Sequence, residues 1–266
     1  MKKYVVAMIL LLSVMPFVLG TGTAMGAEKE KAKELDAKEF FDGKEGTAVL
    51  KNLKTGSVYV YNRERGTKRY TPESTFKVPN ALIGLETSAV RDEYEVKRWD
   101  GVVRNFDNWN RDHSLASAMR ESAIWFYQDM AKDIGETRMK EYIRKMHYGN
   151  EDITGGIDSF WLGSSLKISA YEQAAFIEKL VKEELPFAEK QQKTVKRMIV
   201  QDEQDEYTLY GKTGTRLSDM GLGWYVGFVK SEKNTWVFAV NVNSTGTEAK
   251  NITLDILKEK NIIKKK

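Results

Sequence analysis

Two residue types that perform acyl-transfer chemistry, serine and lysine, stand three positions apart in the segment Ser74-Thr75-Phe76-Lys77. On a helix, residues with this spacing lie on the same side. A serine hydroxyl is a weak nucleophile until a neighbouring base takes its proton, and a lysine can be that base when its ammonium form is destabilised. Burial among apolar residues such as Phe76 and Val78 lowers a lysine pKa. The segment therefore predicts Ser74 as a nucleophile with Lys77 as its general base.

The residue types that the chain lacks narrow the chemistry further. The sequence has no cysteine, which excludes disulfides, a thiolate nucleophile and cysteine-ligated metal sites. Only two histidines occur, His113 and His147, so a metal centre built on several imidazoles is excluded as well. We predict no metal site and assign neither histidine a catalytic role.

A second Ser-x-x-Lys match, Ser164-Ser165-Leu166-Lys167, lies just before Ser169. The segment Ser169-Ala170-Tyr171-Glu172 has the capping-box pattern, in which the serine and glutamate side chains satisfy free amide groups where a helix begins. The lysine of the second match is therefore expected in a loop, where no helical turn aligns it with a serine. We predict that this second match carries no chemistry.

Two further segments carry residues suited to the same reaction. Ser122 precedes a helical run, and its hydroxyl could relay a proton between a base and a leaving group, or simply cap the helix. The segment Lys212-Thr213-Gly214 ends a predicted strand, whose alternation points Lys212 and Gly214 to one face. The Lys212 cation and the Thr213 hydroxyl could hold a substrate carboxylate, and Gly214 would let a substrate backbone or ring approach an edge strand closely. Taken singly, these residues could equally be a surface charge and a turn.

The elements that must position these residues alternate between strands and helices along the chain. Strands at both ends of the chain around a helical middle predict an α+β fold, with one antiparallel sheet and an inserted helical region over about residues 90–200. Gly56 lies between the first two strand-like runs and indicates a hairpin turn. The predicted strands are 47–53, 57–62, 207–212, 223–230 and 235–243, and the predicted helices are 74–85, several pieces within 114–198, and 249–258.

The first 26 residues have the layout of a signal peptide: a basic start, an apolar run over 4–19 and a tail of small residues. The apolar run is shorter than the ~20 residues that span a bilayer, so we predict export with cleavage and no stable membrane span afterwards. Residues 27–44 are expected to form a linker or frayed helix, and 45–266 the catalytic domain. The formal net charge of +4 falls to +2 when Lys2 and Lys3 are removed. A charge this small does not indicate a nucleic-acid partner. The predicted location is extracellular or cell-wall associated, and the sequence carries no signal for an oligomeric state.

The order Ser-x-x-Lys, a serine motif and Lys-Thr-Gly resembles the penicilloyl serine transferases, which include penicillin-binding proteins and serine β-lactamases. Within them the chain is most similar to the class D β-lactamases over about residues 34–260. Four segments carry this closer resemblance: Ser122-Ala123-Ile124 for the Ser-x-Val motif, Tyr148-Gly149-Asn150 for Tyr-Gly-Asn, Trp161 within Phe160-Trp161-Leu162, and Trp224-Tyr225-Val226-Gly227.

The resemblance implies a secreted enzyme that opens the β-lactam amide of penicillins through an acyl-enzyme on Ser74. It implies that Lys77 reacts with carbon dioxide to form a carbamate, which acts as the general base, and that Trp161 donates its indole N–H to that carbamate. Apart from this carbon dioxide, no cofactor is expected.

The resemblance also implies how the substrate is held. The backbone N–H groups of Ser74 and Thr215 would form the oxyanion hole. Ser122 would pass a proton to the lactam nitrogen, while Lys212 and Thr213 would bind the substrate carboxylate. The expected partner is thus a small β-lactam molecule.

The chain departs from the family pattern at two positions. Ile124 stands where the middle motif has valine, and its extra methylene is expected to restrict the hydrolytic water. The stretch 247–251 has no arginine where the family binds the substrate carboxylate. Lys250 is the candidate replacement, although a point charge lacks the bidentate fork of arginine.

Two other functions remain open on the sequence. The first is a penicillin sensor, which is acylated at the same serine and stays acylated. The second is a D,D-peptidase or esterase that uses the same serine and lysine on other acyl groups.

Overall fold

The computed structural model describes residues 31–264. Residue contacts divide the chain into residues 1–31 and a compact unit, Ala32–Lys266, and it is this second unit whose fold is described. The predicted signal peptide, residues 1–26, lies outside the described residues. Within the described stretch, no helix is both long and apolar enough to cross a membrane.

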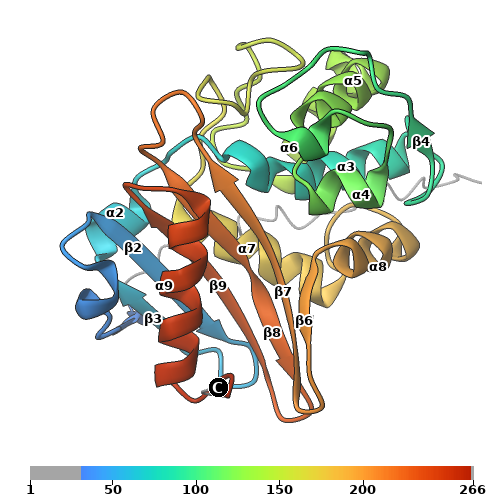
Figure 1. Ribbon diagram of the computed structural model, residues 1–266. Coiled ribbons are helices and arrows are strands. Elements are labelled where there is room, and N and C mark those ends of the chain that lie inside the picture. The colour runs from blue at the N-terminus through green and yellow to red at the C-terminus, as the bar shows by residue number, and fades with distance from the viewer. Residues whose placement is uncertain (1–30, 265–266) are drawn as a thin grey trace, which may run out of the picture. The chain divides into compact units, whose positions relative to one another are not determined.

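A seven-stranded sheet forms the middle of the unit (Figure 1). Its neighbouring strands run antiparallel except for the first, which pairs in parallel with β3. The predicted α+β class and antiparallel sheet are therefore confirmed. In spatial order the strands are β1 (Lys33–Glu34), β3 (Val58–Tyr61), β2 (Gly46–Asn52), β9 (Thr235–Val242), β8 (Gly223–Ser231), β7 (Tyr207–Thr215) and β6 (Val200–Glu203).

Helices cover both faces of the sheet, and this explains why its central strands are apolar on both sides. The C-terminal helix α9 (Gly246–Glu259) packs on one face, and α7 (Ala170–Lys182) packs on the other (Figure 1). Residues 223–229 of β8 are all buried. Tyr225 belongs to the apolar core on the α9 face, and its neighbour Val226 belongs to the larger core on the opposite face.

The larger core lies between the sheet and the remaining helices. Its centre is α3 (Lys77–Glu86), in which every residue up to Leu85 is buried. Because α7 packs against β2, β8 and β9, it belongs with the sheet, although its sequence falls within the predicted insertion. The other helices are α2 (Arg63–Thr67), α4 (Leu115–Arg120), α5 (Ile124–Ile134), α6 (Glu136–Met146) and α8 (Glu189–Met198). A small second sheet pairs β4 (Val96–Lys97) with β5 (His113–Ser114).

Several local predictions are confirmed. Gly56 has a φ of 69° in the turn between β2 and β3, a conformation that glycine adopts without strain. Ser169 and Glu172 form the predicted capping box at the start of α7. The strand β6 was not predicted, because its sequence Val-Gln-Asp-Glu has no alternating pattern and is largely exposed.

The segment after Lys31 differs from the linker or frayed helix expected over 27–44. It forms β1 and then a short 3-10 helix, Lys38–Phe41. Leu35 and Phe41 are each 1% exposed and belong to the core on the α9 face. A few apolar side chains are enough to hold this segment in place, because the sheet edge and the α9 face supply most of the apolar surface that they contact.

Candidate active site

The nucleophile turn, defined here as the 3-10 turn Glu73–Phe76, leads directly into α3, which begins at Lys77. This continuous helical path places the two side chains of the first Ser-x-x-Lys match on one side, as their spacing predicts. Lys77 Nζ donates a hydrogen bond to Ser74 Oγ over 2.9 Å. The nucleophile and its candidate base are thus in direct contact.

Lys77 is buried to an unusual degree for a lysine, with 0% of its surface exposed. Burial lowers the pKa of Lys77 well below its ordinary value of 10.5, and the neighbouring Lys212 cation lowers it further, whereas the Glu73 carboxylate acts in the opposite direction. The Nζ atom also lies 5.4 Å from the ring centre of Tyr127. Burial and the Lys212 cation favour a neutral amine, which has the lone pair that a general base needs.

Lys212 extends from β7 to the same site. Its Nζ donates to Ser122 Oγ over 3.0 Å and to the Thr213 carbonyl over 2.9 Å. Burial lowers the pKa of Lys212 to about 7, and the charge of Lys250 contributes. Because 90 positions of sequence separate Ser122 from Lys212, only the tertiary fold brings this pair together.

Ser122 does not cap the helix that follows it. The capping position of α5 is Ala123, and Ser122 occupies the link between α4 and α5 with a φ of 58°. A non-glycine residue in this left-handed region is strained, and such residues cluster at functional sites. The strained link directs the Ser122 hydroxyl to Lys212 instead of to the amide groups of the helix.

Gly214 makes the close approach between β7 and the nucleophile turn possible. A Cβ atom at this position would lie 3.0 Å from the Pro72 carbonyl oxygen and 3.2 Å from the backbone nitrogens of Ser74 and Thr75. The sequence predicts that Gly214 lets a substrate approach the strand, whereas the close neighbour seen here is the backbone of the nucleophile turn. Lys212 and Gly214 lie opposite Val226 and Trp224, on the face of the larger core.

The other residues of this segment face α9. Thr213 is half-buried and lies opposite Tyr225, on the face that α9 covers. Thr215 Oγ1 accepts a hydrogen bond of 2.8 Å from the backbone nitrogen of Gly246, the first residue of α9. The end of β7 is thus held between the nucleophile turn and the start of α9.

Trp161 lies within the larger core with 0% of its surface exposed. Its ring stacks on Phe76 at a centroid distance of 5.4 Å, and its backbone oxygen accepts a hydrogen bond of 3.0 Å from the Glu73 nitrogen. The indole Nε1 has no hydrogen-bond partner among the described residues. A buried N–H group without a partner is costly, so a ligand or modified side chain that accepts its hydrogen bond would be stabilised here.

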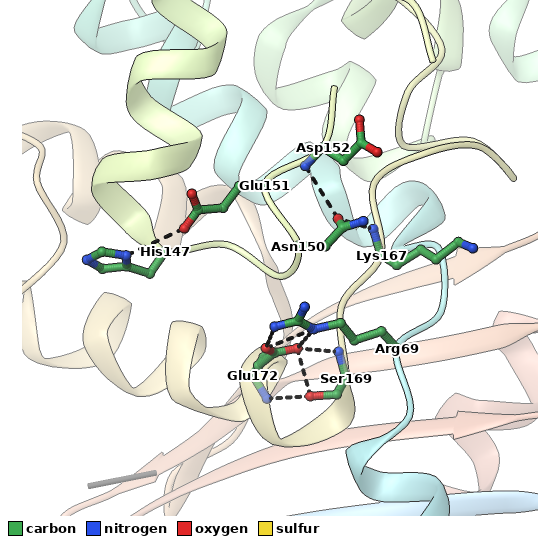
Figure 2. A network of polar contacts seen from close by, with 8 residues as sticks. All are labelled: Arg69, His147, Asn150, Glu151, Asp152, Lys167, Ser169 and Glu172. Carbon is green, nitrogen blue, oxygen red and sulfur yellow. Dashed lines mark hydrogen bonds and ion pairs between the residues drawn. The ribbon is translucent and has the colours of Figure 1, made fainter. Parts of the chain in front are cut away.

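The Tyr148-Gly149-Asn150 segment fixes the loop that carries Trp161. Asn150 Oδ1 accepts a hydrogen bond from the Lys167 backbone nitrogen over 2.8 Å (Figure 2), and the Asn150 backbone nitrogen donates to the Lys167 carbonyl over 2.9 Å. The Asn150 Nδ2 donates to the Ser165 carbonyl over 2.9 Å. The Tyr148 ring packs edge-on against Phe76. This segment therefore positions the loop and contributes no reacting group of its own.

Ile124 and Lys250 differ in how directly they reach the site. Ile124 is the first residue of α5 and is half-buried two positions after Ser122. Lys250 Nζ donates to Gln201 Oε1 over 2.9 Å and lies 5.8 Å from the ring centre of Tyr225. Lys250 thus lies on the α9 side of β7, where its charge influences Lys212.

The second Ser-x-x-Lys match and the histidines lie outside this cluster. Residues 164–167 form no helix, as predicted, and the backbone of Lys167 binds Asn150. Both ring nitrogens of His113 have partners, Ser117 Oγ at 3.0 Å and the Asn108 carbonyl at 2.8 Å. His147 ends α6, and its side chain lies 3.5 Å from Glu151 (Figure 2). No group of three or more candidate ligand side chains for a metal ion occurs in the part of the chain that the structure describes.

Sequence reasoning missed Glu73, the residue directly before the nucleophile. Its side chain is 2% exposed, and its Oε1 accepts hydrogen bonds from Thr71 Oγ1 and from the Gly163 backbone nitrogen. The only signal in the sequence was an acidic residue directly before the Ser-x-x-Lys segment. Its role could not be predicted from that, because its hydrogen-bond partner Gly163 is 90 positions away.

The Ser74–Lys77 and Ser122–Lys212 contacts are those of a serine acyl-transfer protein. Comparisons with known proteins lead to the same class. Residues 46–260 match the family model of the penicillin-binding protein transpeptidase domain. The chain is 56% identical over 265 residues to the probable β-lactamase YbxI of Bacillus subtilis (strain 168), with 99% of each chain covered. It therefore belongs to the class D β-lactamases, a family of serine hydrolases within that transpeptidase class.

Solved structures support the same assignment. The crystal structure of a class D β-lactamase from Bacillus subtilis superimposes with a TM-score of 0.85 at 61% identity, covering 87% of this chain and 98% of the other. The C-terminal domain of the Bacillus licheniformis BlaR penicillin receptor has a TM-score of 0.84 at 35% identity, covering 88% and 98%.

Proposed function

We propose that this protein hydrolyses the β-lactam amide of penicillins through an acyl-enzyme on Ser74. The observation that carries the proposal is the contact between Ser74 Oγ and the fully buried Lys77 Nζ, beside the second contact between Ser122 and Lys212. Acyl transfer needs a nucleophile with a base and a separate group that protonates the leaving nitrogen. The two pairs supply these parts.

In the acylation step, Ser74 Oγ attacks the lactam carbonyl carbon and gives its proton to the base at Lys77. The bond between the carbonyl carbon and the lactam nitrogen then breaks, and Ser122 passes a proton to that nitrogen. Lys212, 3.0 Å from Ser122 Oγ, restores the proton of the hydroxyl. The proton that the base took from Ser74 then passes through solvent to Lys212, which restores both groups. In deacylation, a water molecule gives a proton to the base and attacks the ester carbon, the bond from that carbon to Ser74 Oγ breaks, and the base returns the proton to Ser74 Oγ.

The backbone holds the charge that develops on the carbonyl oxygen. We assign the N–H groups of Ser74 and Thr215 to this oxyanion hole, because Gly214 brings the end of β7 against the nucleophile turn. Lys212 and Thr213 are the proposed partners of the substrate carboxylate. Lys250 is a further candidate from the α9 side, whereas Ile124 narrows the space beside the base.

We also propose that Lys77 carries carbon dioxide as a carbamate, which would supply an anionic oxygen base next to Ser74. Two properties of the chain suit this group. Burial favours the neutral amine of Lys77, the form that can bind carbon dioxide. The unpartnered Nε1 of Trp161 can donate a hydrogen bond to a buried anionic oxygen. The apolar surroundings of Phe76 and Trp161 keep bulk water away from the group.

We further propose export, with residues 1–26 as a signal peptide and the remainder acting outside the cell or at the cell wall. The receptor alternative draws on the likeness to the BlaR domain, and the peptidase alternative on the transpeptidase family model. The hydrolase is preferred because the identity to the Bacillus subtilis class D β-lactamase is 61%, against 35% to the receptor.

A kinetic assay with a chromogenic penicillin, followed by intact mass measurement, tests these proposals together. The intact mass of protein recovered from the culture medium should match that of a chain whose first residue lies near position 27. Turnover should rise with added bicarbonate and should fall by at least about a thousandfold in Ser74→Ala and Lys77→Ala. The matched control is Lys167→Ala, the lysine of the second match, which should retain turnover.

Three results would contradict the proposal. Full activity in Ser74→Ala would exclude this nucleophile. One stable acyl adduct without turnover would indicate a sensor. Rapid cleavage of a D-Ala-D-Ala peptide without penicillin turnover would indicate a peptidase.

A further inference from the structure

Glu73 joins the nucleophile turn to the loop of Trp161 through both its backbone and its side chain. Its backbone nitrogen donates to the Trp161 carbonyl over 3.0 Å. Its Oε1 accepts from the Gly163 backbone nitrogen over 2.9 Å and from Thr71 Oγ1 over 2.5 Å. The residue next to the nucleophile thus holds the backbone on both sides of Leu162, and with it the indole ring that stacks on Phe76.

This arrangement is costly, which argues that it serves the site. Glu73 has a φ of 51°, in the left-handed region that non-glycine residues seldom occupy. Burial raises the pKa of its carboxyl group, while the hydrogen bonds from Thr71 and Gly163 and the charges of Arg216 and Lys77 lower it. The two hydrogen bonds and the Arg216 cation favour a buried carboxylate at this position.

The charge of this carboxylate acts on Lys77. Glu73 directly precedes Ser74, whose Oγ lies 2.9 Å from Lys77 Nζ, and both Glu73 and Lys77 are buried. A negative charge so placed favours the protonated amine, and it opposes the burial and the Lys212 cation that lower the pKa of Lys77. Carbamate formation requires the neutral amine: the Nζ lone pair forms a bond to the carbon of carbon dioxide, and one proton leaves the nitrogen for solvent. The product carries one negative charge, which a nearby carboxylate repels.

We propose that Glu73 is a positioning residue that holds the Trp161 loop against the nucleophile turn beside Lys77, and that its charge weakens the binding of carbon dioxide to Lys77. This inference rests on the proposed carbamate and deepens it. Glu73 has two effects of opposite sign: its hydrogen bonds maintain the pocket in which the carbamate is held, and its charge limits how much carbamate forms at low carbon dioxide.

Two substitutions separate the effects. Glu73→Gln removes the charge but keeps an oxygen that accepts from Thr71 and Gly163. Glu73→Asp keeps the charge but shortens the side chain, so that it no longer reaches Gly163. The probe is ¹³C-labelled bicarbonate, and the readout is the ¹³C NMR signal of the lysine carbamate against total bicarbonate. The control is Glu172→Gln, which alters another largely buried carboxylate, paired with Arg69 and Ser169 (Figure 2).

Glu73→Gln should lower the bicarbonate concentration at half-maximal carbamate signal, because the loss of the negative charge favours the neutral amine of Lys77. Glu73→Asp should raise that concentration and should lower kcat at saturating bicarbonate by about tenfold, with a smaller change in KM. Glu172→Gln should leave the half-maximal concentration unchanged even if it lowers the melting temperature.

An unchanged or raised half-maximal concentration in Glu73→Gln would overturn the role of the charge. Wild-type kcat and carbamate signal in Glu73→Asp would overturn the positioning role. If the wild-type protein gives no carbamate signal that Lys77→Ala removes, the proposed carbamate itself fails and this inference fails with it. That outcome differs from a wild-type signal that the Glu73 variants leave unchanged.

Discussion

Lys77 and Lys212 lie in one buried site, and burial alters the protonation of both. Lys77 is 0% exposed and Lys212 is 5% exposed. Burial lowers the pKa of both residues, and the Lys212 cation lowers that of Lys77 further. The two lysines are therefore suited to different roles at neutral pH. Lys77 tends to be neutral and act as a base, whereas Lys212, with a pKa of about 7, can exist in either form.

This difference predicts the pH dependence of kcat/KM, which reports the protonation of the free enzyme. As the pH rises through about 7, Lys212 loses the proton and the charge that bind the substrate carboxylate, so kcat/KM should fall. Arginine stays protonated throughout this range, and Lys212→Arg should therefore have lower activity but no such fall. The measurement is kcat/KM for a penicillin between roughly pH 6 and 9. A level wild-type profile, or the same fall in Lys212→Arg, would refute this role of Lys212.

At the scale of elements, the site is the junction of the nucleophile turn, the link before α5 and the end of β7. The nucleophile turn and the end of β7 meet closely because Gly214 has no side chain. A Cβ atom at this position would lie 3.0–3.2 Å from backbone atoms of residues 72, 74 and 75, which cannot move aside as a flexible side chain could. The separation between β7 and the nucleophile turn is thus determined by backbone contacts.

We expect Gly214→Ala to move the nucleophile turn away from β7. The change should reduce kcat by at least about tenfold, because small displacements of reacting groups are costly, and should lower the free energy of unfolding by about 1–3 kcal/mol. The control is Gly101→Ala, which has a positive φ but open space around it, so it should affect stability without affecting kcat. Steady-state kinetics and urea unfolding measure the two quantities. Wild-type kcat in Gly214→Ala would contradict the proposed packing.

At the scale of the whole molecule, the sheet separates two apolar cores with different tasks. The larger core surrounds Lys77 and contains Phe76 and Trp161, so its packing also positions the reacting groups. The core on the α9 face contains Phe41, whose ring stacks on Tyr61 at a centroid distance of 4.6 Å. Residues that follow the predicted signal peptide therefore contribute to stability from the face opposite Lys212.

Substitutions of one phenylalanine in each core should separate stability from catalysis. Phe41→Ala should lower the free energy of unfolding by about 3–5 kcal/mol while kcat of the folded protein stays within about twofold. Phe76→Ala should cost a similar free energy and also reduce kcat, because Phe76 supports Trp161 and lies next to Lys77. Urea unfolding and kinetics at a temperature where both variants are folded test this. A large loss of kcat in Phe41→Ala would show that the two cores are not independent.

The sequence by itself determined the features that depend on neighbouring residues. These are the Ser74–Lys77 pair, the capping box at Ser169, the turn at Gly56 and the main strands of the sheet. Each follows from spacing along a helix or from local backbone preference, so no distant contact is needed to predict it. The family resemblance rested on the same short motifs.

Only the tertiary structure decided the features that join distant parts of the chain. It brought Ser122 to Lys212, placed Gly214 against the nucleophile turn and linked Glu73 to Gly163. It also incorporated the segment after Lys31 into the sheet, where a linker had been expected. These contacts depend on how the sheet and its covering helices pack together. Packing is determined by the shapes of surfaces assembled from the whole chain, and no local pattern in the sequence specifies those surfaces.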